Sequence, residues 1–205
     1  MPAMIAAPAL ILASTSRYRC ELLERLRLPF SVLAPGVDET PQAGETPSAL
    51  ARRLALAKAD AVATLHPTAV VIGSDQVADL DGRAIGKPLT HERATVQLRS
   101  MRGRSVTFHT AVAVVCAATG HRSVVLVPVL VKFRAFGDAE MEFYLRTEQP
   151  YDCAGSAKAE ALGIALVEAI ESNDPTALVG LPLIRTCDLL REAGLDPLAG
   201  LPNRR

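Results

Sequence analysis

The sequence lacks an excess of charge of one sign, a long apolar run and a closely spaced pair of cysteines. Its 205 residues contain 22 Lys or Arg and 22 Asp or Glu, which removes any global electrostatic case for binding nucleic acid or a membrane surface. No apolar stretch approaches the roughly 20 residues needed to span a bilayer. Any anionic ligand must therefore be held by a local cluster of positive charge.

Two further absences narrow the function. There is no GxxxxGK[ST] loop, which excludes a Walker-type NTPase. The apolar run 1–13 has no basic segment before it, so we expect a short tail over 1–8 and then a buried strand, not a secretory signal. The cysteines lack the spacing of a zinc or redox site, and we expect small buried side chains kept reduced in a cytoplasmic protein. These are Cys20, Cys116, Cys153 and Cys187.

What is present is enough apolar material for a core, at 49% of residues, arranged as interleaved strands and helices. The hairpin signal Asp81-Gly82 and two long adjacent strands add antiparallel pairs to a βα pattern. We therefore predict one α/β domain over 1–205 with a mixed sheet and flanking helices. Strands are expected at 9–13, 69–72, 77–80, 107–116, 123–133 and 164–170. Helices are expected from the opening segment 14–16 to a stop at Pro29, and at 47–65, 90–101 (capped by Thr90), 138–146 (capped by Asp138) and 183–192.

The first candidate site is the segment 14–19, at a predicted strand-to-helix turn. Free backbone N–H groups and the hydroxyl of Ser14 favour an anion there. Arg17 and Arg19 lie at the positive end of the helix dipole, which is unfavourable unless an anion sits between them. The alternative is an ordinary capped helix with solvated arginines.

Four further positions carry charge where a ligand could use it. Lys58 falls within the apolar stripe of its helix, formed by Leu50, Leu54, Ala57, Ala61 and Leu65, and either snorkels or points into a cleft. Asp75 follows a buried strand, where ligands bind in open α/β sheets, although a turn residue is the simpler alternative. Lys87 between glycine and proline, and Glu39 in an acidic pair, are weaker signals. Together these groups suit metal-assisted attack on a polyphosphate.

At this point the chain resembles the Maf-like nucleotide pyrophosphatases. The matching segments follow the family's order and span nearly the whole chain. They are LILASTS at 10–16 with Arg19, VDET at 37–40, AKA at 57–59, IGSDQ at 72–76, GKP at 86–88, CAGS at 153–156 and VGLP at 179–182.

The resemblance implies two lobes around a substrate cleft, a divalent cation (Mg or Mn), and hydrolysis between the α- and β-phosphates. It casts Asp75 as the catalytic proton acceptor. Ser14, Arg19, Lys58 and Lys87 would bind the triphosphate, and Glu39 with Asp75 would hold the metal. We expect a nucleotide as the partner, with no nucleic acid or membrane, and leave a homodimer open beside a monomer.

Tyr18, Gln76 and Glu160 bear on the base. An aromatic, glutamine and glutamate at these places are similar to the branch acting on 7-methyl-GTP, whereas the UTP and dTTP branch has arginine, threonine and glutamine. The physics agrees, since a cationic methylated guanine favours an aromatic face and a nearby carboxylate. The first loop departs from the usual pattern at Arg17, Tyr18 and Cys20. The alternatives are the same chemistry on UTP or dTTP, and a catalytically idle nucleotide-binding regulator of cell division.

Overall fold

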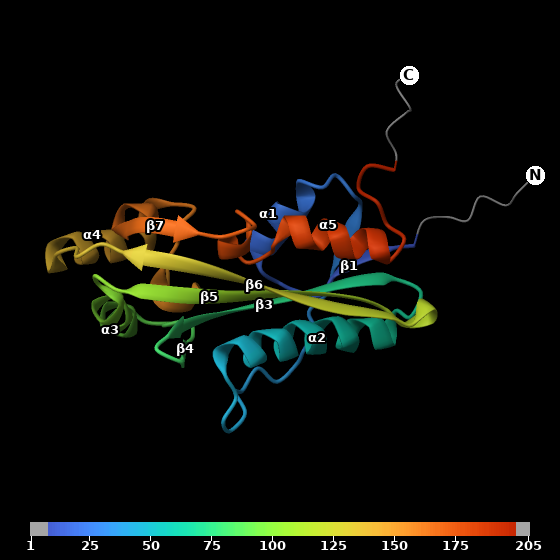
Figure 1. Ribbon diagram of the computed structural model, residues 1–205, viewed down its shortest axis with the longest axis horizontal. Coiled ribbons are helices and arrows are strands. Elements are labelled where there is room, and N and C mark those ends of the chain that lie inside the picture. Colours follow the sequence, from blue (N-terminus) through green and yellow to red (C-terminus); the bar gives the residue numbers. More distant parts are fainter. Residues whose placement is uncertain (1–7, 200–205) are drawn as a thin grey trace, which may run out of the picture.

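The computed structural model describes residues 8–199, so most of the predicted tail over 1–8 lies outside the described residues. A single sheet runs through the molecule (Figure 1), with strand order β2-β1-β3-β5-β6-β7 and β4 paired to β3. The strands are β1 (Leu10–Leu12), β2 (Phe30–Val32), β3 (Val70–Leu80), β4 (Arg83–Ile85), β5 (Ser105–Cys116), β6 (His121–Phe133) and β7 (Val167–Glu171).

The sheet is mixed, as predicted. β1 pairs in parallel with β2 and β3, because helices connect these strands and crossover connections permit parallel neighbours. The remaining pairs are antiparallel. Asp81 and Gly82, with φ of 55° and 78°, make the tight turn between β3 and β4 that the sequence indicated.

The prediction that a strand ends before Gly73 is wrong. β3 continues through Asp75 to Leu80, because β5 pairs with it at every residue from Val71 to Asp79. Gly73 allows this close packing, since a Cβ there would lie 2.2 Å from the carbonyl oxygen of Ala55 in the neighbouring helix. Asp75 is therefore a mid-strand residue.

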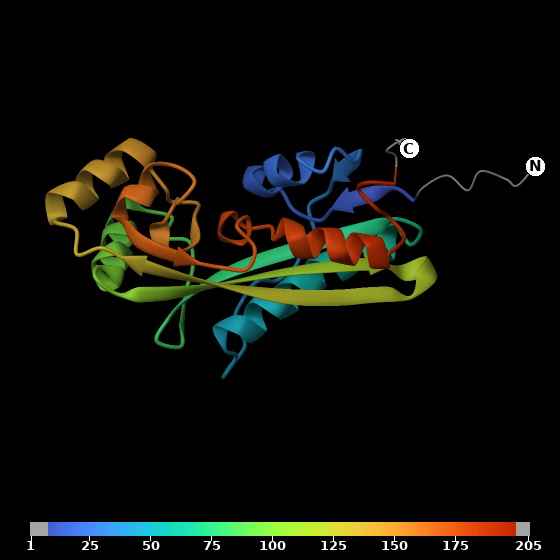
Figure 2. The same ribbon diagram turned by 45° about the horizontal axis from the view of Figure 1, so that its top comes forward.

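Helices cover both faces of the sheet. α2 lies on one face, and α1 and α5 lie on the other, while α3 and α4 gather at the opposite end of the long strands (Figures 1 and 2). The helices are α1 (Arg17–Glu24), α2 (Pro47–Leu65), α3 (His91–Met101), α4 (Asp138–Glu148) and α5 (Leu183–Glu192), with 3-10 turns η1 (Ala117–Thr119), η2 (Ala154–Ser156), η3 (Leu162–Leu166) and η4 (Ala177–Val179). The α/β class with flanking helices is confirmed.

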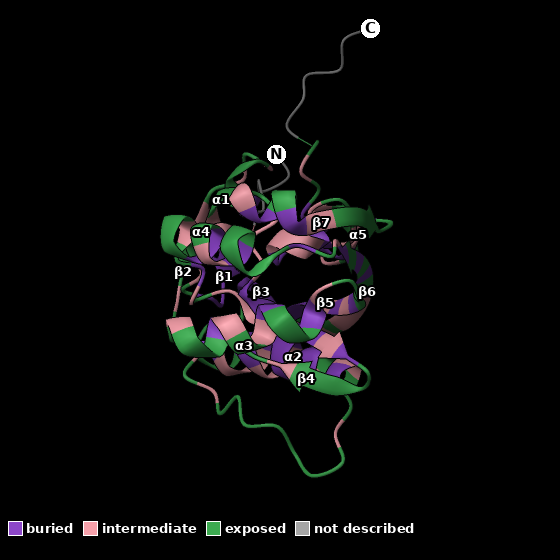
Figure 3. Ribbon diagram, turned by 90° about the vertical axis from the view of Figure 1, so that its left-hand side faces the viewer, coloured by how far each residue is buried: buried purple, intermediate pink, exposed green. Residues whose placement is uncertain are grey.

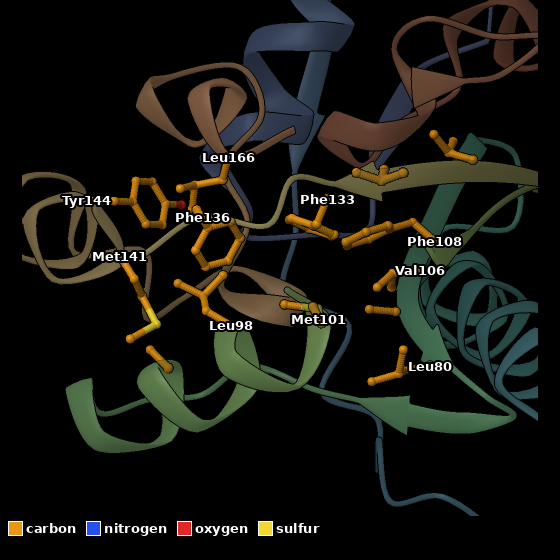
Figure 4. Close-up of a cluster of buried hydrophobic side chains, with 14 of the residues drawn as sticks. Leu80, Leu98, Met101, Val106, Phe108, Phe133, Phe136, Met141, Tyr144 and Leu166 are labelled. Carbon is orange, nitrogen blue, oxygen red and sulfur yellow. The ribbon is translucent and has the colours of Figure 1, made fainter. Parts of the chain in front are cut away.

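The buried side chains form three clusters. One lies under α2 and one under α1 and α5. The third fills the far end between α3, α4 and the sheet, where Phe108, Phe136 and Tyr144 meet Met101 and Leu98 (Figure 4). Figure 3 shows buried residues along the central strands β3 and β5. The first two clusters lie on opposite faces at one end of the sheet, and the third lies at the other end. The two ends of the sheet thus have separate cores.

Several local predictions need correction. The buried face of α2 includes Ala55, Ala59 and Val62 in place of part of the predicted stripe, and Leu65 is 76% exposed because it falls outside this face. Asp138 is the first helical residue of α4, not its cap. The segment read as a strand from 164 begins as the 3-10 turn η3.

The cysteines differ in burial, and no described helix suits a membrane. All four cysteines are free, but only Cys116 is buried, because the others lie on partly exposed helix and loop faces. In the part of the chain from 8 to 199, no helix combines the length and apolar character needed to cross a membrane.

Candidate active site

A pocket of about 800 Å³ opens at a gap in the sheet. β1 pairs with β3 only over Val70–Ile72, and β4 pairs with it only over Ala78–Leu80. Of the β3 residues between these two partners, Asp75, Gln76 and Val77 line the pocket. The sequence-predicted site residues all line it, namely Ser14, Tyr18, Arg19, Glu39, Lys58, Asp75, Gln76, Lys87 and Glu160.

The turn from β1 into α1 places Ser14 and Arg19 together. The Ser14 hydroxyl accepts from the backbone N–H of Ser16 at 3.2 Å and from Nη1 of Arg19 at 3.3 Å. Nε of Arg19 donates to the carbonyl of Gly180 at 3.0 Å. Burial lowers the pKa of Arg19, while the charges of Asp75 and Glu39 raise it. Its guanidinium is thus a fixed positive group in the wall.

Lys58 lies between two carboxylates. Its Nζ is 2.8 Å from Oε1 of Glu39 and 2.7 Å from Oδ1 of Asp75. The Lys58 and Asp75 side chains are 6% and 9% exposed, so each buried charge depends on the other for neutralisation. An ammonium group has three N–H donors, and these contacts use two of them. One donor remains for a ligand.

The electrostatics favour an anion beside these carboxylates. Burial raises the pKa of Glu39. Its hydrogen bond to Lys58 and the charges of Lys58, Lys87 and Arg19 together lower that pKa by more, so it lies below the ordinary value. Lys87 follows β4 and is exposed in the pocket wall. Three cations from α1, α2 and the loop after β4 therefore surround the carboxylate pair.

The carboxylate pair also fits a hard divalent cation. Such an ion takes oxygen ligands and commonly uses one or two protein carboxylates, with phosphate and water oxygens completing the shell. Asp75 and Glu39 supply two carboxylates that already share one cation within 2.8 Å. Across residues 8–199 no group of three or more metal-ligating side chains gathers. Oxygens of the substrate or of water would therefore complete the shell of a metal bound here.

Gln76 forms part of the opposite wall. Its Nε2 lies 2.9 Å from Oγ1 of Thr110, 3.0 Å from the carbonyl of Ala177 and 2.9 Å from that of Leu178. Backbone carbonyls can only accept, so the amide nitrogen must face them. The Gln76 Oε1 atom is consequently left for the pocket as a hydrogen-bond acceptor.

Tyr18 lies at the same end, and the side chain of the neighbouring Arg17, which also lines the pocket, packs against it. The Arg17 guanidinium donates to the Tyr18 hydroxyl at 2.9 Å and lies 4.8 Å from the ring centroid. Cys153 lies 3.9 Å from the same hydroxyl. Burial, with the charge of Asp152, raises the pKa of the Cys153 thiol to about 12, so it stays neutral.

Glu160 completes this end of the pocket. Its side chain is exposed, but the surrounding wall still desolvates it, and this raises the pKa of its carboxyl above the ordinary value. Lys158 lowers that pKa, but Lys158 itself is hydrogen-bonded to Glu148 at 3.0 Å. With Gln76, Glu160 gives this end two acceptors and no amide donor.

Sequence reasoning missed the groups that hold these side chains. The carbonyl of Gly180 accepts from Arg19 and also from Ser74, at 3.0 and 2.9 Å. Gly180 has φ of 117°, which favours glycine, and lies in the VGLP segment. The match of this segment to the family pattern was the sequence signal that could have indicated the role of Gly180. Nothing in the local pattern around Thr110 indicated its contact with Gln76.

Comparison with known proteins gives a consistent result. A family model described as Maf-like protein matches residues 9–193. A protein named 7-methyl-GTP pyrophosphatase from Albidiferax ferrireducens is 63% identical over 189 residues, covering 92% of this chain and 95% of the relative. Proteins of the same name from Polaromonas sp. (66% identical, 91% and 85% covered) and Bordetella pertussis (58% identical, 98% and 100% covered) are also similar.

Proposed function

The chain belongs to the family of Maf-like proteins, and on that premise we propose that it hydrolyses 7-methyl-GTP to 7-methyl-GMP and pyrophosphate. Its high identity to relatives that carry the name 7-methyl-GTP pyrophosphatase supports this substrate. We propose that it works in the cytosol and clears a modified nucleotide before it is misincorporated or misread.

One observation carries the proposal. A single pocket joins the carboxylates of Asp75 and Glu39, bound to Lys58, with the acceptors of Gln76 and Glu160. The first end suits a triphosphate and its hydrolysis, and the second suits a base that donates hydrogen bonds. A nucleotide spans both ends.

At the triphosphate end, Asp75 is the proton acceptor. Lys58 holds its Oδ1, so the other carboxylate oxygen is free to take a proton from water as that water attacks the α-phosphorus. The bond from the α-phosphorus to the bridging oxygen breaks, and pyrophosphate leaves with that oxygen. Arg19 and Lys87 neutralise the charge that develops on the phosphates, and Ser14 helps to fix Arg19.

Glu39 and Asp75 would hold a divalent cation, Mg or Mn, whose chemistry is to neutralise phosphate charge and lower the pKa of bound water. The donor set fits such a hard cation, because both ligands are carboxylates. Lys58 keeps these carboxylates in place beside the phosphates.

At the base end, Gln76 and Glu160 accept from the N1–H and N2–H₂ edge of guanine. A uracil edge has a single N–H between two carbonyls and cannot match two acceptors in the same way. Tyr18 stacks on the base. Because Arg17 already lies over the Tyr18 ring, the Glu160 charge contributes more than the ring to selecting a cationic base.

A turnover screen over 7-methyl-GTP, GTP, UTP and dTTP with pyrophosphate detection tests the proposal. We expect 7-methyl-GTP to give the highest kcat/KM. A higher kcat/KM for UTP or dTTP would show that the proposed substrate is wrong and that the proposed pyrophosphate-releasing reaction is right. Nucleotide binding without pyrophosphate release from any of them would indicate an idle binding protein and overturn the proposal.

A further inference from the structure

The loop that carries Lys87 is tied to the rest of the pocket by a side chain outside it. Gln97, in the middle of α3, donates from Nε2 to the carbonyl of Gly86 at 3.1 Å. Its Oε1 accepts from the hydroxyl of Ser156 at 2.6 Å. Since the Gly86 carbonyl only accepts, the amide orientation is fixed and both of its ends are used. Gln97 is thus a bridge between two walls of the pocket.

The far end of this bridge is rigid. Ser156 is fully buried, and its carbonyl accepts from the Tyr144 hydroxyl at 3.0 Å. The preceding Gly155 packs on the core, where a Cβ would meet Phe108 and Met101 at 3.4 and 3.6 Å. The turn η2 is therefore anchored in the cluster of Figure 4.

The Lys87 loop has few other anchors. The N–H of Gly155 donates to the Gly86 carbonyl at 3.3 Å, and the N–H of Leu89 donates to the Tyr151 carbonyl at 3.1 Å. Leu89 has φ of 66°, which costs free energy for a residue with a side chain. Such a conformation persists only where its surroundings determine it. Gln97 supplies the one side-chain hydrogen bond to Gly86, next to Lys87, within the described residues.

We propose that Gln97 is a positioning residue for the reaction. It holds the Gly86 carbonyl against η2, and so fixes where the Lys87 ammonium meets the triphosphate. Gln97 does not line the pocket, so it acts only through the loop. This inference rests on the proposed function, because it assumes that Lys87 contacts phosphate.

A double-mutant cycle separates positioning from general stabilisation. The variants are Gln97→Met, Lys87→Ala and the two combined, assayed for kcat and KM with 7-methyl-GTP. Losing one such hydrogen bond corresponds to about a 3- to 10-fold loss, which we expect in kcat/KM for Gln97→Met, mainly through KM. In the Lys87→Ala background the same change should cost less than about twofold, because no lysine remains to position.

Two further variants serve as controls for this cycle. Ser100→Ala, on the same helix, removes a hydroxyl that contacts only the backbone of Gln97, and should behave like wild type. Gln97→Asn keeps the amide but is too short to bridge both partners, so it should show the loss expected for Gln97→Met. It takes the place of Gln97→Met in the cycle if that variant folds poorly.

Equal losses from Gln97→Met with and without Lys87 would overturn the positioning role, as would wild-type kinetics in both Gln97 variants. If the wild type releases no pyrophosphate from any nucleotide, the proposed function fails at that earlier step. The two failures are therefore distinguishable.

Discussion

The Nζ atom of Lys58 lies 2.7 Å from Oδ1 of Asp75, in a contact that is almost closed to solvent. The lysine comes from α2 and the aspartate from the middle of β3. Glu39 reaches the same ammonium from an exposed loop. The pair therefore fixes one oxygen of Asp75 and leaves the other to the pocket, which is the arrangement a proton acceptor needs.

Asp75→Asn should leave the protein folded and able to bind nucleotide, and should lower kcat by at least about a hundredfold, the scale of a lost acid–base group. The asparagine still offers Lys58 an oxygen. Asp79→Asn is the matched control, because Asp79 lies on the same strand but outside the pocket and pairs with His109. Turnover above about a third of wild type in Asp75→Asn would remove Asp75 from the catalytic role.

Lys87→Ala should weaken kcat/KM for every nucleotide by a similar factor, because phosphate contacts carry no information about the base. Lys58→Ala should do the same and cost more, since it also leaves Glu39 and Asp75 unneutralised. The check is kcat/KM for four nucleotides with each variant. A changed rank order of substrates would contradict the assignment of either lysine to the phosphates.

Glu160→Gln should reduce the preference for 7-methyl-GTP over GTP more than Tyr18→Phe does. A charge-assisted hydrogen bond is worth roughly 1.5–3 kcal/mol, whereas Tyr18→Phe keeps the ring and its stacking energy of about 0.5–2 kcal/mol. Competition assays with 7-methyl-GTP, GTP and UTP on the wild type and both variants measure this. A larger loss from Tyr18→Phe would assign the selectivity to the tyrosine hydroxyl and its Arg17 contact.

The preference for 7-methyl-GTP should depend on pH through Glu160. Desolvation by the pocket wall raises the pKa of this carboxyl, so as pH falls it takes up a proton at a higher pH than an ordinary glutamate. Its charge, and the selectivity that needs it, are present above the raised pKa and lost below it. The ratio of kcat/KM for 7-methyl-GTP and GTP should fall on acidification, and this fall should vanish in Glu160→Gln. A persistent fall in that variant would place the titrating group elsewhere.

Gly73→Ala should destabilise the fold, because its Cβ would lie 2.2 Å from the Ala55 carbonyl and 2.7 Å from the Ala59 nitrogen. α2 would have to move away from β3, at a cost of about 1–3 kcal/mol or more. Gly86→Ala is the control, since nothing lies within 4 Å of a Cβ there. Denaturant unfolding gives the free energy of unfolding of both variants. Equal values would mean that α2 can move away from β3 at no measurable cost.

Much of this arrangement follows from local sequence signals. The apolar spacing placed Lys58 on the buried face of α2, and the resemblance assembled the site residues that line the pocket. Local signals failed where distant segments decide the structure. β3 continues past Gly73 because β5, more than thirty residues later, pairs with it. The Gln76 amide is turned by carbonyls about a hundred residues away. No short-range pattern encodes such contacts.

The alternation of side chains along β3 has an evolutionary consequence. Successive side chains of a strand point to opposite faces, so Asp75 meets Lys58 on one side while Gln76 meets η4 on the other. Under the proposed function, the proton acceptor and a residue that contacts the base are adjacent in the sequence but have separate surroundings. If Gln76 selects the base as proposed, substitutions at residue 76 and at the groups it contacts would change the nucleotide preference and leave the contact between Lys58 and Asp75 intact. An insertion or deletion within this strand would disturb both at once, so new specificities in such a fold should arise by substitution.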